Sequence, residues 1–388
     1  MPSVPLVVAS ISLAIWLYLA LARGAFWRLR EFDDDIAKHE ALSAWPRVIA
    51  VVPARNEAAT IAQALASLLK QNYAGEFSVV LVDDHSEDAT TQIARQAARE
   101  INAESRTTIR AAAPLPAEWA GKLWALNEGV SHASSAPTYY WFTDADIVHA
   151  PDTLRRLVAR AERNHLDLAS LMVLLQAKTL PERALIPAFL FFFLKLYPPR
   201  WIADPKARTA GAAGGCILLR REALQRMGGL AAIRNEVIDD CALARAVKRS
   251  DGRLWMGLTR ASISLRAYTT FAETTDMIAR TAFTQLRYSP LLLLGTLAAM
   301  FLMYLAPAAI LFAFAHQPAA QILGASLWLL MSLLYLPTIR FYRLPPAWAA
   351  TLPLSALFYS YATFLSAVRY YLGRGAQWKG RSQATRPQ

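Results

Sequence analysis

Two carboxylates one residue apart follow an apolar run in the first half of the chain. Asp144 and Asp146 flank Ala145, directly after the segment 138–143, which reads Thr-Tyr-Tyr-Trp-Phe-Thr. Residues i and i+2 of an extended chain point to the same side, so both carboxylates can face one ligand. Mg²⁺ and Mn²⁺ prefer such oxygen ligands and often share them with substrate phosphates. Because most Asp-x-Asp pairs lie in solvated turns, the prediction of a metal site depends on neighbouring polar clusters.

Two further segments with the pattern of strands also end in polar clusters. The predicted strand 48–52 is followed by the cluster 53–57, and the predicted strand 77–82 is followed by the acidic cluster 83–88. Helical patterns come after both, and this alternation is typical of an α/β domain. Ligands of parallel α/β sheets bind beyond the carboxyl ends of the strands. We therefore expect the three clusters to lie at one rim of a sheet.

Three other motifs carry groups that could act on a substrate at this rim. The pair Asp239-Asp240 could supply a base for an attacking hydroxyl, or it could simply be stabilised by the dipole of the helix predicted after it. Lys122 follows Gly121 and could place a positive charge on phosphates, or it could be an exposed loop lysine. Gly214-Gly215 lacks a phosphate-loop pattern, so these small residues are expected to let a substrate approach the backbone.

The composition predicts that part of the chain lies in a membrane. Of the 388 residues, 55% are hydrophobic, and the mean hydropathy is +0.24. Four apolar stretches are near the length that crosses a bilayer, namely 5–22, 291–315, 320–339 and 347–368. The first is predicted to be a retained anchor, because no basic segment precedes it and no clean cleavage site follows it. Arg23, Arg28 and Arg30 would place its C-terminal end in the cytoplasm.

The charge and cysteine content fit the same interpretation. The chain carries 41 Lys and Arg against 29 Asp and Glu, a net charge of +12. Much of this excess flanks apolar segments, which favours a lipid bilayer as partner and argues against nucleic acid. The two cysteines, Cys216 and Cys241, do not indicate a disulfide scaffold, so we expect a reduced cytoplasmic domain.

These patterns predict six regions along the chain. They are an N-terminal transmembrane anchor (1–22), a linker (23–46), a cytoplasmic catalytic domain (47–268), an interfacial amphipathic segment (269–290), C-terminal membrane helices (291–372) and a basic tail (373–388). The apolar but interrupted segment 185–201 is expected to be an interfacial helix or a buried lid. Three C-terminal spans would put the basic tail outside the cytoplasm, against the positive-inside rule. A cytoplasmic tail, with one of the three stretches re-entrant or interfacial, is therefore favoured, and the prediction is two or three spans.

Together these motifs resemble the family 2 glycosyltransferases with a GT-A fold. The resemblance covers roughly residues 45–290 and includes the strand-end clusters together with 121–127, 214–216, 239–244 and 285–288. Within that family the chain is similar to the hopanoid-associated membrane glycosyltransferases of bacteria, through 238–244, 284–287 and 373–381. The resemblance implies a Rossmann-like mixed α/β sheet plus transmembrane helices, in a multi-pass protein of the bacterial inner (cytoplasmic) membrane with its catalytic domain in the cytoplasm.

The resemblance also implies a donor site. Asp84 would hold the nucleobase, usually uracil, of a nucleotide-sugar donor, with Pro53, Arg55 and Glu57 beside it. Asp144 and Asp146 would meet Mg²⁺ or Mn²⁺ and the ribose or diphosphate, with Asp146 as the firmer metal ligand. Lys122 would add its charge to the phosphates. The metal would neutralise the leaving nucleoside diphosphate.

On the acceptor side, the resemblance makes Asp240 the base and Asp239 its support, although the family usually has Glu-Asp at these positions. Gln285 and Arg287 form a compressed version of the Gln-x-x-Arg-Trp signature, with tyrosine at position 288. Arg287 could equally be a snorkelling arginine beside a membrane helix. The residues expected to contact the acceptor or the diphosphate are Gly214, Gly215, Gln285, Arg287 and Trp378.

The leading prediction is metal-assisted, inverting transfer of one sugar, from a UDP-sugar, to a membrane lipid such as a hopanoid or another polyprenoid. A processive polysaccharide synthase is the alternative within the same enzyme class, and the altered signature and few spans argue against it. A non-catalytic membrane scaffold or transporter subunit that binds nucleotide-sugar is the alternative from another class. A transporter should carry ionisable residues inside its spans, and the stretch 291–315 has none.

Overall fold

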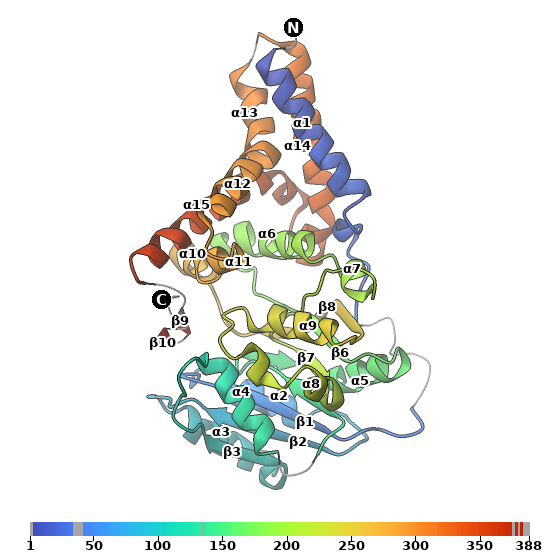
Figure 1. Cartoon of the computed structure of the whole chain (residues 1–388), viewed down its shortest axis with the longest axis vertical. Coiled ribbons are helices and arrows are strands. Elements are labelled where there is room, and N and C mark those ends of the chain that lie inside the picture. Colours follow the sequence, from blue (N-terminus) through green and yellow to red (C-terminus); the bar gives the residue numbers. More distant parts are fainter. Residues whose placement is uncertain are drawn as a thin grey trace. The chain divides into compact units, whose positions relative to one another are not determined.

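The computed structural model describes residues 3–33, 42–133, 136–314, 316–374, 377–378 and 381–382. The chain forms two compact units (Figure 1). The helical unit comprises Met1–Arg30, Ala177–Arg200 and Tyr268–Gly375, and the sheet unit comprises Glu31–Gln176, Trp201–Ala267 and Ala376–Gln388. The segment 177–200 thus belongs to the helical unit, although the chain enters it from the sheet unit and returns there.

The sheet unit is built on one eight-stranded sheet that mixes parallel and antiparallel pairs. In order across the sheet, the strands are β3 (Thr107–Ala111), β2 (Phe77–Asp83), β1 (Val48–Ala54), β4 (Tyr139–Phe142), β7 (Ile217–Arg220), β6 (Leu168–Leu174), β8 (Leu254–Ser264) and β5 (Ile147–His149). Strands β3, β2, β1 and β4 are parallel, whereas β7 runs antiparallel to both β4 and β6. The predicted mixed α/β fold is confirmed.

Strand β1 brings the polar clusters together. All of its residues are buried, as expected for a β-branched strand in the centre of a parallel sheet. Its register pairs Ala54 with Asp83 of β2 on one side and Val51 with Phe142 of β4 on the other. The ends of β2, β1 and β4 are therefore neighbours, and the prediction of one shared rim is confirmed.

Helices follow the strands of the sheet unit. They are α2 (Ile61–Leu69), α3 (Thr90–Glu100), α4 (Gly121–Ser131), α5 (Thr153–Arg163), α8 (Arg221–Arg226) and α9 (Asp239–Arg249), with short 3₁₀ turns η3 (Glu104–Arg106) and η4 (Leu230–Ile233); α7 (Pro199–Ala203) begins at the boundary between the units. Helix α4 packs closely on β1 at Gly129, where a Cβ would lie 2.3 Å from Cγ1 of Val51. Only glycine allows this approach, which sets the position of Lys122 at the start of α4.

The helical unit contains the apolar stretches. Its elements are α1 (Val4–Leu21), η1 (Phe26–Arg28), α6 (Leu180–Leu196), α10 (Phe271–Ala279), α11 (Ala282–Gln285), α12 (Pro290–Met300), η5 (Phe301–Leu305), α13 (Ala306–Ala313), α14 (Pro318–Phe341), η6 (Pro346–Thr351) and α15 (Leu352–Tyr371). Within the described ranges, four helices are long and apolar enough to cross a membrane, namely Val4–Leu21, Pro290–Ala313, Pro318–Phe341 and Pro346–Tyr371. The number that do cross it stays a prediction.

Helix α6 accounts for most of the apolar segment 185–201, whose conformation the sequence left open. It begins with a capping box, in which Thr179 accepts from the backbone N–H of Glu182 and Glu182 accepts from the backbone N–H of Thr179. A box of this kind satisfies two N–H groups that lack helical partners. The Glu182 carboxylate also accepts from the backbone of Tyr268 at 2.8 Å, which ties the start of α6 to the approach to α10.

Acid should destabilise the sheet unit through His149 on β5. Its ring is buried, and burial lowers its pKa from 6.5 to about 3. Because the unfolded chain binds a proton below pH 6.5 and the folded chain does not, stability falls as the pH drops from 6.5 towards 3. At about pH 5 we expect a loss of about 2 kcal/mol relative to neutral pH. Thermal melts of wild type and His149→Gln across this range test it; equal pH slopes would contradict the prediction.

Candidate active site

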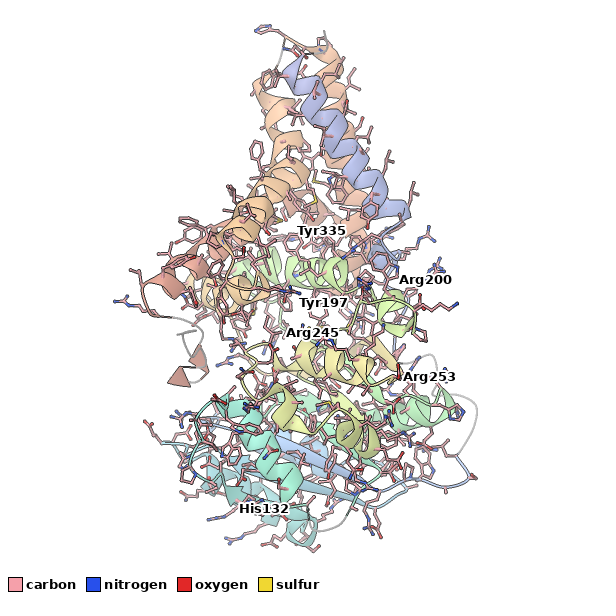
Figure 2. All side chains as sticks on the ribbon, viewed as in Figure 1. His132, Tyr197, Arg200, Arg245, Arg253 and Tyr335 are labelled. Atoms are coloured by element: carbon pink, nitrogen blue, oxygen red, sulfur yellow. The ribbon has the colours of Figure 1, made fainter. Side chains whose placement is uncertain are left out.

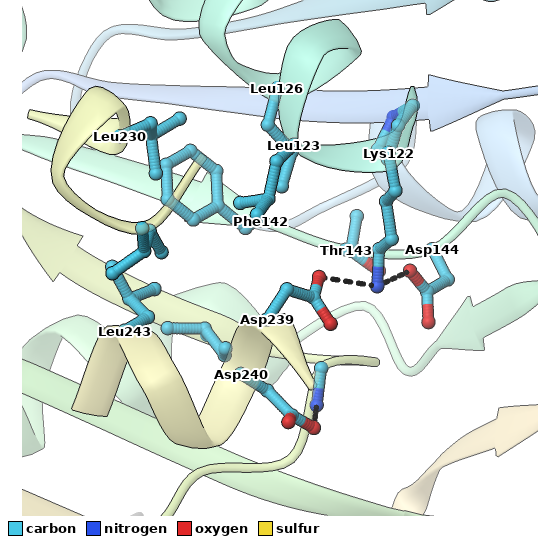
Figure 3. A pocket seen from close by; sticks show the side chains of 14 residues that line it. Lys122, Leu123, Leu126, Phe142, Thr143, Asp144, Leu230, Asp239, Asp240 and Leu243 are labelled. Carbon is cyan, nitrogen blue, oxygen red and sulfur yellow. Dashed lines mark hydrogen bonds and ion pairs between the residues drawn. The ribbon is translucent and has the colours of Figure 1, made fainter. Parts of the chain in front are cut away.

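A pocket lies at the rim formed by the strand ends of the sheet unit (Figure 3). The ends of β1 and β4, the first turns of α4 and α9, and the 3₁₀ turn η4 supply most of its wall. The lining side chains are Pro53, Lys122, Leu123, Leu126, Phe142, Thr143, Asp144, Gly214, Ile217, Leu230, Ile233, Asp239, Asp240 and Leu243. One side is therefore charged and the other apolar.

Lys122 is the centre of the charged side. Its Nζ lies 2.9 Å from Oδ1 of Asp144 and 3.1 Å from Oδ2 of Asp239, as Figure 3 shows. Burial alone would lower the pKa of Lys122, but the two carboxylates outweigh burial and raise it. The lysine is thus held as a cation between the end of β4 and the start of α9, which rules out the alternative of an exposed loop lysine.

Asp240 lies beside this ion-pair cluster and is held by backbone donors. The N–H of Gly214 donates to Oδ2 at 2.9 Å, and the N–H of Cys241 donates to Oδ1 at 2.7 Å. Burial and the neighbouring Asp239 carboxylate raise the pKa of Asp240 to about 6, while Lys122 opposes this rise. Its carboxylate is therefore ionised at neutral pH yet basic enough to accept a proton.

The ends of β1 and β2 form a second, tightly bonded part of the rim. The Arg55 guanidinium donates to the carbonyls of Asp84 at 2.6 Å and His85 at 3.0 Å. Asn56, at φ 50°, accepts from the N–H of Glu87 at 2.8 Å. The Asp84 residue is 1% exposed. The predicted nucleobase residues therefore lie together at this part of the rim, but of these only Pro53 lines the pocket.

Glu57 belongs to the same part of the rim. Its N–H donates to Oγ1 of Thr90 at 2.7 Å, and its carboxylate accepts from Oγ1 of Thr60 at 3.0 Å. These bonds hold Glu57 in the turn that precedes α2, where its carbonyl accepts from the N–H groups of Thr60 and Ile61. Its predicted contact with the donor stays a prediction.

The donor atoms present fit a divalent cation. Across the described ranges, no group of three or more His, Cys, Asp and Glu side chains gathers as a metal cluster. Asp144 and Asp239 nevertheless already converge on one cation, the Lys122 ammonium. Mg²⁺ is commonly held by one or two carboxylates together with substrate phosphates and water. Asp146 is half-buried and does not line the pocket, and its carbonyl accepts from the N–H of Leu265 at 2.8 Å.

The remaining predicted contacts are distributed over both units. Gln285 belongs to the helical unit and donates to Oη of Tyr197 at 2.7 Å. Arg287 and Tyr288 follow it with φ of 52° and 56°, two consecutive left-handed residues that are rare outside glycine. The backbone of Trp378 lies in β9 (Gln377–Trp378), which pairs with β10 (Arg381–Ser382). The contacts proposed for Gln285, Arg287 and Trp378 stay predictions.

Sequence reasoning missed the apolar side of the pocket and Thr143. Leu123, Leu230 and Leu243 come from three separate elements. Each is an ordinary core residue in the local pattern, so nothing nearby in sequence marks it. Thr143 did offer a signal, because it is a polar residue between a buried aromatic strand and Asp144.

Comparisons with known proteins give one matching family model and solved structures of similar fold. Residues 49–228 match the family described as Glycosyl transferase family 2. No curated protein matches the chain. Among solved structures, the mannosyltransferase PcManGT from Pyrobaculum calidifontis, in complex with GDP-Man and Mn²⁺, is similar over 90% of this chain and 98% of its own, with 22% identity and a TM-score of 0.56. This likeness shows a shared fold.

Two further structures are more distant. Glucosyl-3-phosphoglycerate synthase from Mycobacterium tuberculosis, in complex with Mg²⁺ and uridine-diphosphate, is similar over 63% of this chain and 80% of its own, with 16% identity and a TM-score of 0.39. TarS from S. aureus is similar over 80% of this chain and 55% of its own, with 16% identity and a TM-score of 0.40. The match over residues 49–228, which includes Lys122 and Asp144 of the strand-end site, indicates that the protein is a glycosyltransferase with a domain similar to family 2.

Proposed function

We propose that this glycosyltransferase transfers a single sugar from a nucleoside-diphosphate sugar to a membrane lipid by metal-assisted, inverting displacement. The observation that carries the proposal is the convergence of Asp144, Asp239 and Lys122 beside the separately held Asp240. A charged cluster can bind the diphosphate that leaves, and a neighbouring carboxylate can take the proton of the hydroxyl that attacks.

Asp240 is proposed as the base. Attack of a lipid hydroxyl on the anomeric carbon forms the new glycosidic bond and breaks the bond to the diphosphate, while the hydroxyl proton passes to the Asp240 carboxylate. The other two carboxylates of the pocket are paired with Lys122, so they are poor candidates for a covalent nucleophile. A direct displacement without a glycosyl-enzyme intermediate inverts the anomeric configuration.

Asp144 and Asp239 are the residues proposed to hold Mg²⁺ or Mn²⁺. The metal, when bound, would neutralise charge on the departing diphosphate as a Lewis acid. Lys122, the ammonium now between these carboxylates, would turn to the phosphates when the donor enters. The prediction that Asp146 is a further ligand is retained as part of the proposal.

The acceptor is proposed to be a lipid hydroxyl, with a hopanoid or another polyprenoid as its class. Four helices long and apolar enough to cross a bilayer support a membrane location. Arg23, Arg28 and Arg30 follow the first of them and support a cytoplasmic catalytic domain in an inner membrane. The nucleobase of the donor is a point for experiment, because the sequence predicted uracil whereas PcManGT was solved with GDP-Man.

The direct test is a transfer assay with the full-length protein in detergent. Radiolabelled UDP-glucose and GDP-mannose are each supplied with Mn²⁺ and a bacterial lipid extract, and the products are separated and identified by mass spectrometry. We expect one donor to label a lipid with a single sugar, in a reaction that EDTA stops. Long polymeric products would support a synthase, and donor binding without any product would support a scaffold.

The transfer rate should depend on pH through Asp240. A base with a raised pKa of about 6 is protonated and inactive below that pH, so kcat should rise with pH and level off above about 6. Because the positive charge of Lys122 lowers the pKa of Asp240, Lys122→Gln should move the rising limb to higher pH. Profiles of kcat against pH for both proteins measure this. If the rising limb of the kcat profile lies at the same pH in Lys122→Gln and wild type, it does not report the ionisation of Asp240.

A further inference from the structure

Four consecutive residues behind the pocket are each held by a different side chain. Ser170 Oγ accepts from the N–H of Ala213 at 2.9 Å, and Asp240 accepts from the N–H of Gly214 at 2.9 Å. Thr143 Oγ1 donates to the carbonyl of Gly215 at 2.9 Å, and Trp141 Nε1 donates to Sγ of Cys216 at 3.3 Å. We call residues 213–216 the anchored turn. It joins the end of β4, which carries Asp144, to the base Asp240.

Thr143 is in turn held by a buried histidine. Oγ1 of Thr143 lies 2.8 Å from Nε2 of His149, and Nδ1 of His149 lies 2.8 Å from Oγ of Ser262 on β8. All three side chains are buried, with exposed fractions of 1%, 3% and 0% for Thr143, His149 and Ser262. A buried polar chain of this kind contributes only if every member is satisfied.

The directions of these bonds follow from counting protons. The hydroxyl of Thr143 has one proton, and it donates this proton in the hydrogen bond to the carbonyl of Gly215. Towards His149 it can therefore only accept, from Nε2–H. The other ring nitrogen, Nδ1, carries no proton in this tautomer and must accept from the hydroxyl of Ser262. Each group in this chain therefore donates a hydrogen bond to the next, in the order Ser262, His149, Thr143 and the carbonyl of Gly215.

We infer that His149 is a positioning residue for the transfer reaction, which acts through Thr143 to fix the distance between Asp144 and the base Asp240. The inference rests on the proposed function of the pocket. Thr143 directly precedes Asp144, and Gly215 directly follows Gly214, whose N–H holds Asp240. Without the hydrogen bond from His149, the Thr143 side chain can rotate away from the carbonyl of Gly215. The connection between Asp144 and Asp240 through Thr143 and the anchored turn is then weakened.

The hydrogen-bonded chain from Ser262 through His149 and Thr143 to Gly215 should affect the chemical step more than nucleotide binding. None of its hydrogen bonds reaches the nucleobase cluster at the ends of β1 and β2, which Arg55 and Asn56 hold through separate hydrogen bonds. Small displacements of reacting groups, in contrast, lower rates strongly. We expect kcat to fall while the affinity for the nucleotide stays close to the wild-type value.

Two matched substitutions separate positioning from packing. In His149→Gln the amide nitrogen can take the place of Nε2 and donate to Thr143. In His149→Asn the shorter amide reaches only the place of Nδ1, so Ser262 keeps a partner and Thr143 loses its donor. We expect His149→Asn to lower kcat about tenfold, with Kd for GDP or UDP and Mn²⁺ within about twofold of wild type, and His149→Gln to restore most of the rate.

Hydrogen exchange measures the support of the anchored turn without any turnover. Peptides covering residues 213–216 should exchange faster in His149→Asn than in wild type, and at the wild-type rate in His149→Gln. Equal kcat and equal exchange in all three proteins would overturn the inference. So would equal losses in both variants accompanied by weaker nucleotide binding, because these indicate a role in packing alone. If the wild type transfers no sugar, the proposed function fails, whereas exchange still decides whether His149 supports the turn.

Discussion

Asp240→Asn should lower kcat for sugar transfer by about a thousandfold. Asparagine has nearly the same shape, but it cannot take the proton from an attacking hydroxyl. Its amide nitrogen also cannot accept from one of the two backbone N–H groups that hold Asp240, so the melting temperature must be measured beside the rate. Initial rates measured at pH values well above the pKa of Asp240 isolate this loss, because the wild-type carboxylate is then fully ionised. The affinity for nucleotide and Mn²⁺ should change little, since the carboxylates that converge on Lys122 are Asp144 and Asp239.

Asp251→Asn is the matched control for this substitution. Asp251 is exposed, lies just after α9 and has φ 61°, a conformation that asparagine tolerates well. This variant should keep the wild-type rate and melting temperature. If Asp240→Asn melts like the control and retains more than about a tenth of the wild-type kcat, the reaction does not depend on Asp240 as its base.

The part of the site that could be predicted from sequence is the part built from local patterns. Each of the strands β1, β2 and β4 is a short apolar run that ends in a polar cluster, and these runs lie close together in the parallel half of the sheet. Because parallel strands share a carboxyl edge, the shared rim follows from the strand predictions alone. The prediction that Asp144 and Lys122 lie near a diphosphate came from the family resemblance and not from the strand pattern.

The rest depends on pairings between distant segments. Strand β7 inserts beside β4 in the antiparallel direction, and β5 pairs with β8 more than a hundred residues later. Neither pairing leaves a local pattern. His149 therefore gave no signal as a partner of Thr143, since its role requires β5, β8 and the end of β4 to meet. The anchored turn was expected only as a place of close approach.

The sequence marked Asp144 and Asp239 as candidate site residues, but it did not predict that both would pair with the same lysine. Each has a local explanation, one as half of an Asp-x-Asp pair and the other as an acid in the first turn of α9. The structure adds that both lie on the Lys122 ammonium. The metal prediction thus changes from a pair on one strand to a pair formed between β4 and α9.

Opposite effects on Mn²⁺ binding should follow from substitutions at the two ends of this ion pair. Asp144→Asn removes a carboxylate from the cluster, so we expect weaker Mn²⁺ binding and about a hundredfold lower kcat/KM. Lys122→Gln removes the ammonium that Mn²⁺ must displace, so we expect binding on the order of tenfold tighter in the absence of nucleotide. Mn²⁺ titrations followed by electron paramagnetic resonance measure both effects on the folded protein.

Asp146→Asn completes the comparison and decides between the two carboxylates of the Asp-x-Asp pair. The sequence favoured Asp146 as the firmer ligand, but Asp144 is the one that lines the pocket and already pairs with a cation. We therefore expect Asp146→Asn to weaken Mn²⁺ binding less than Asp144→Asn does. A larger effect at Asp146 would move the metal away from Lys122. Tighter binding in Lys122→Gln would then have no explanation, because its ammonium and the metal would no longer compete for the same oxygens.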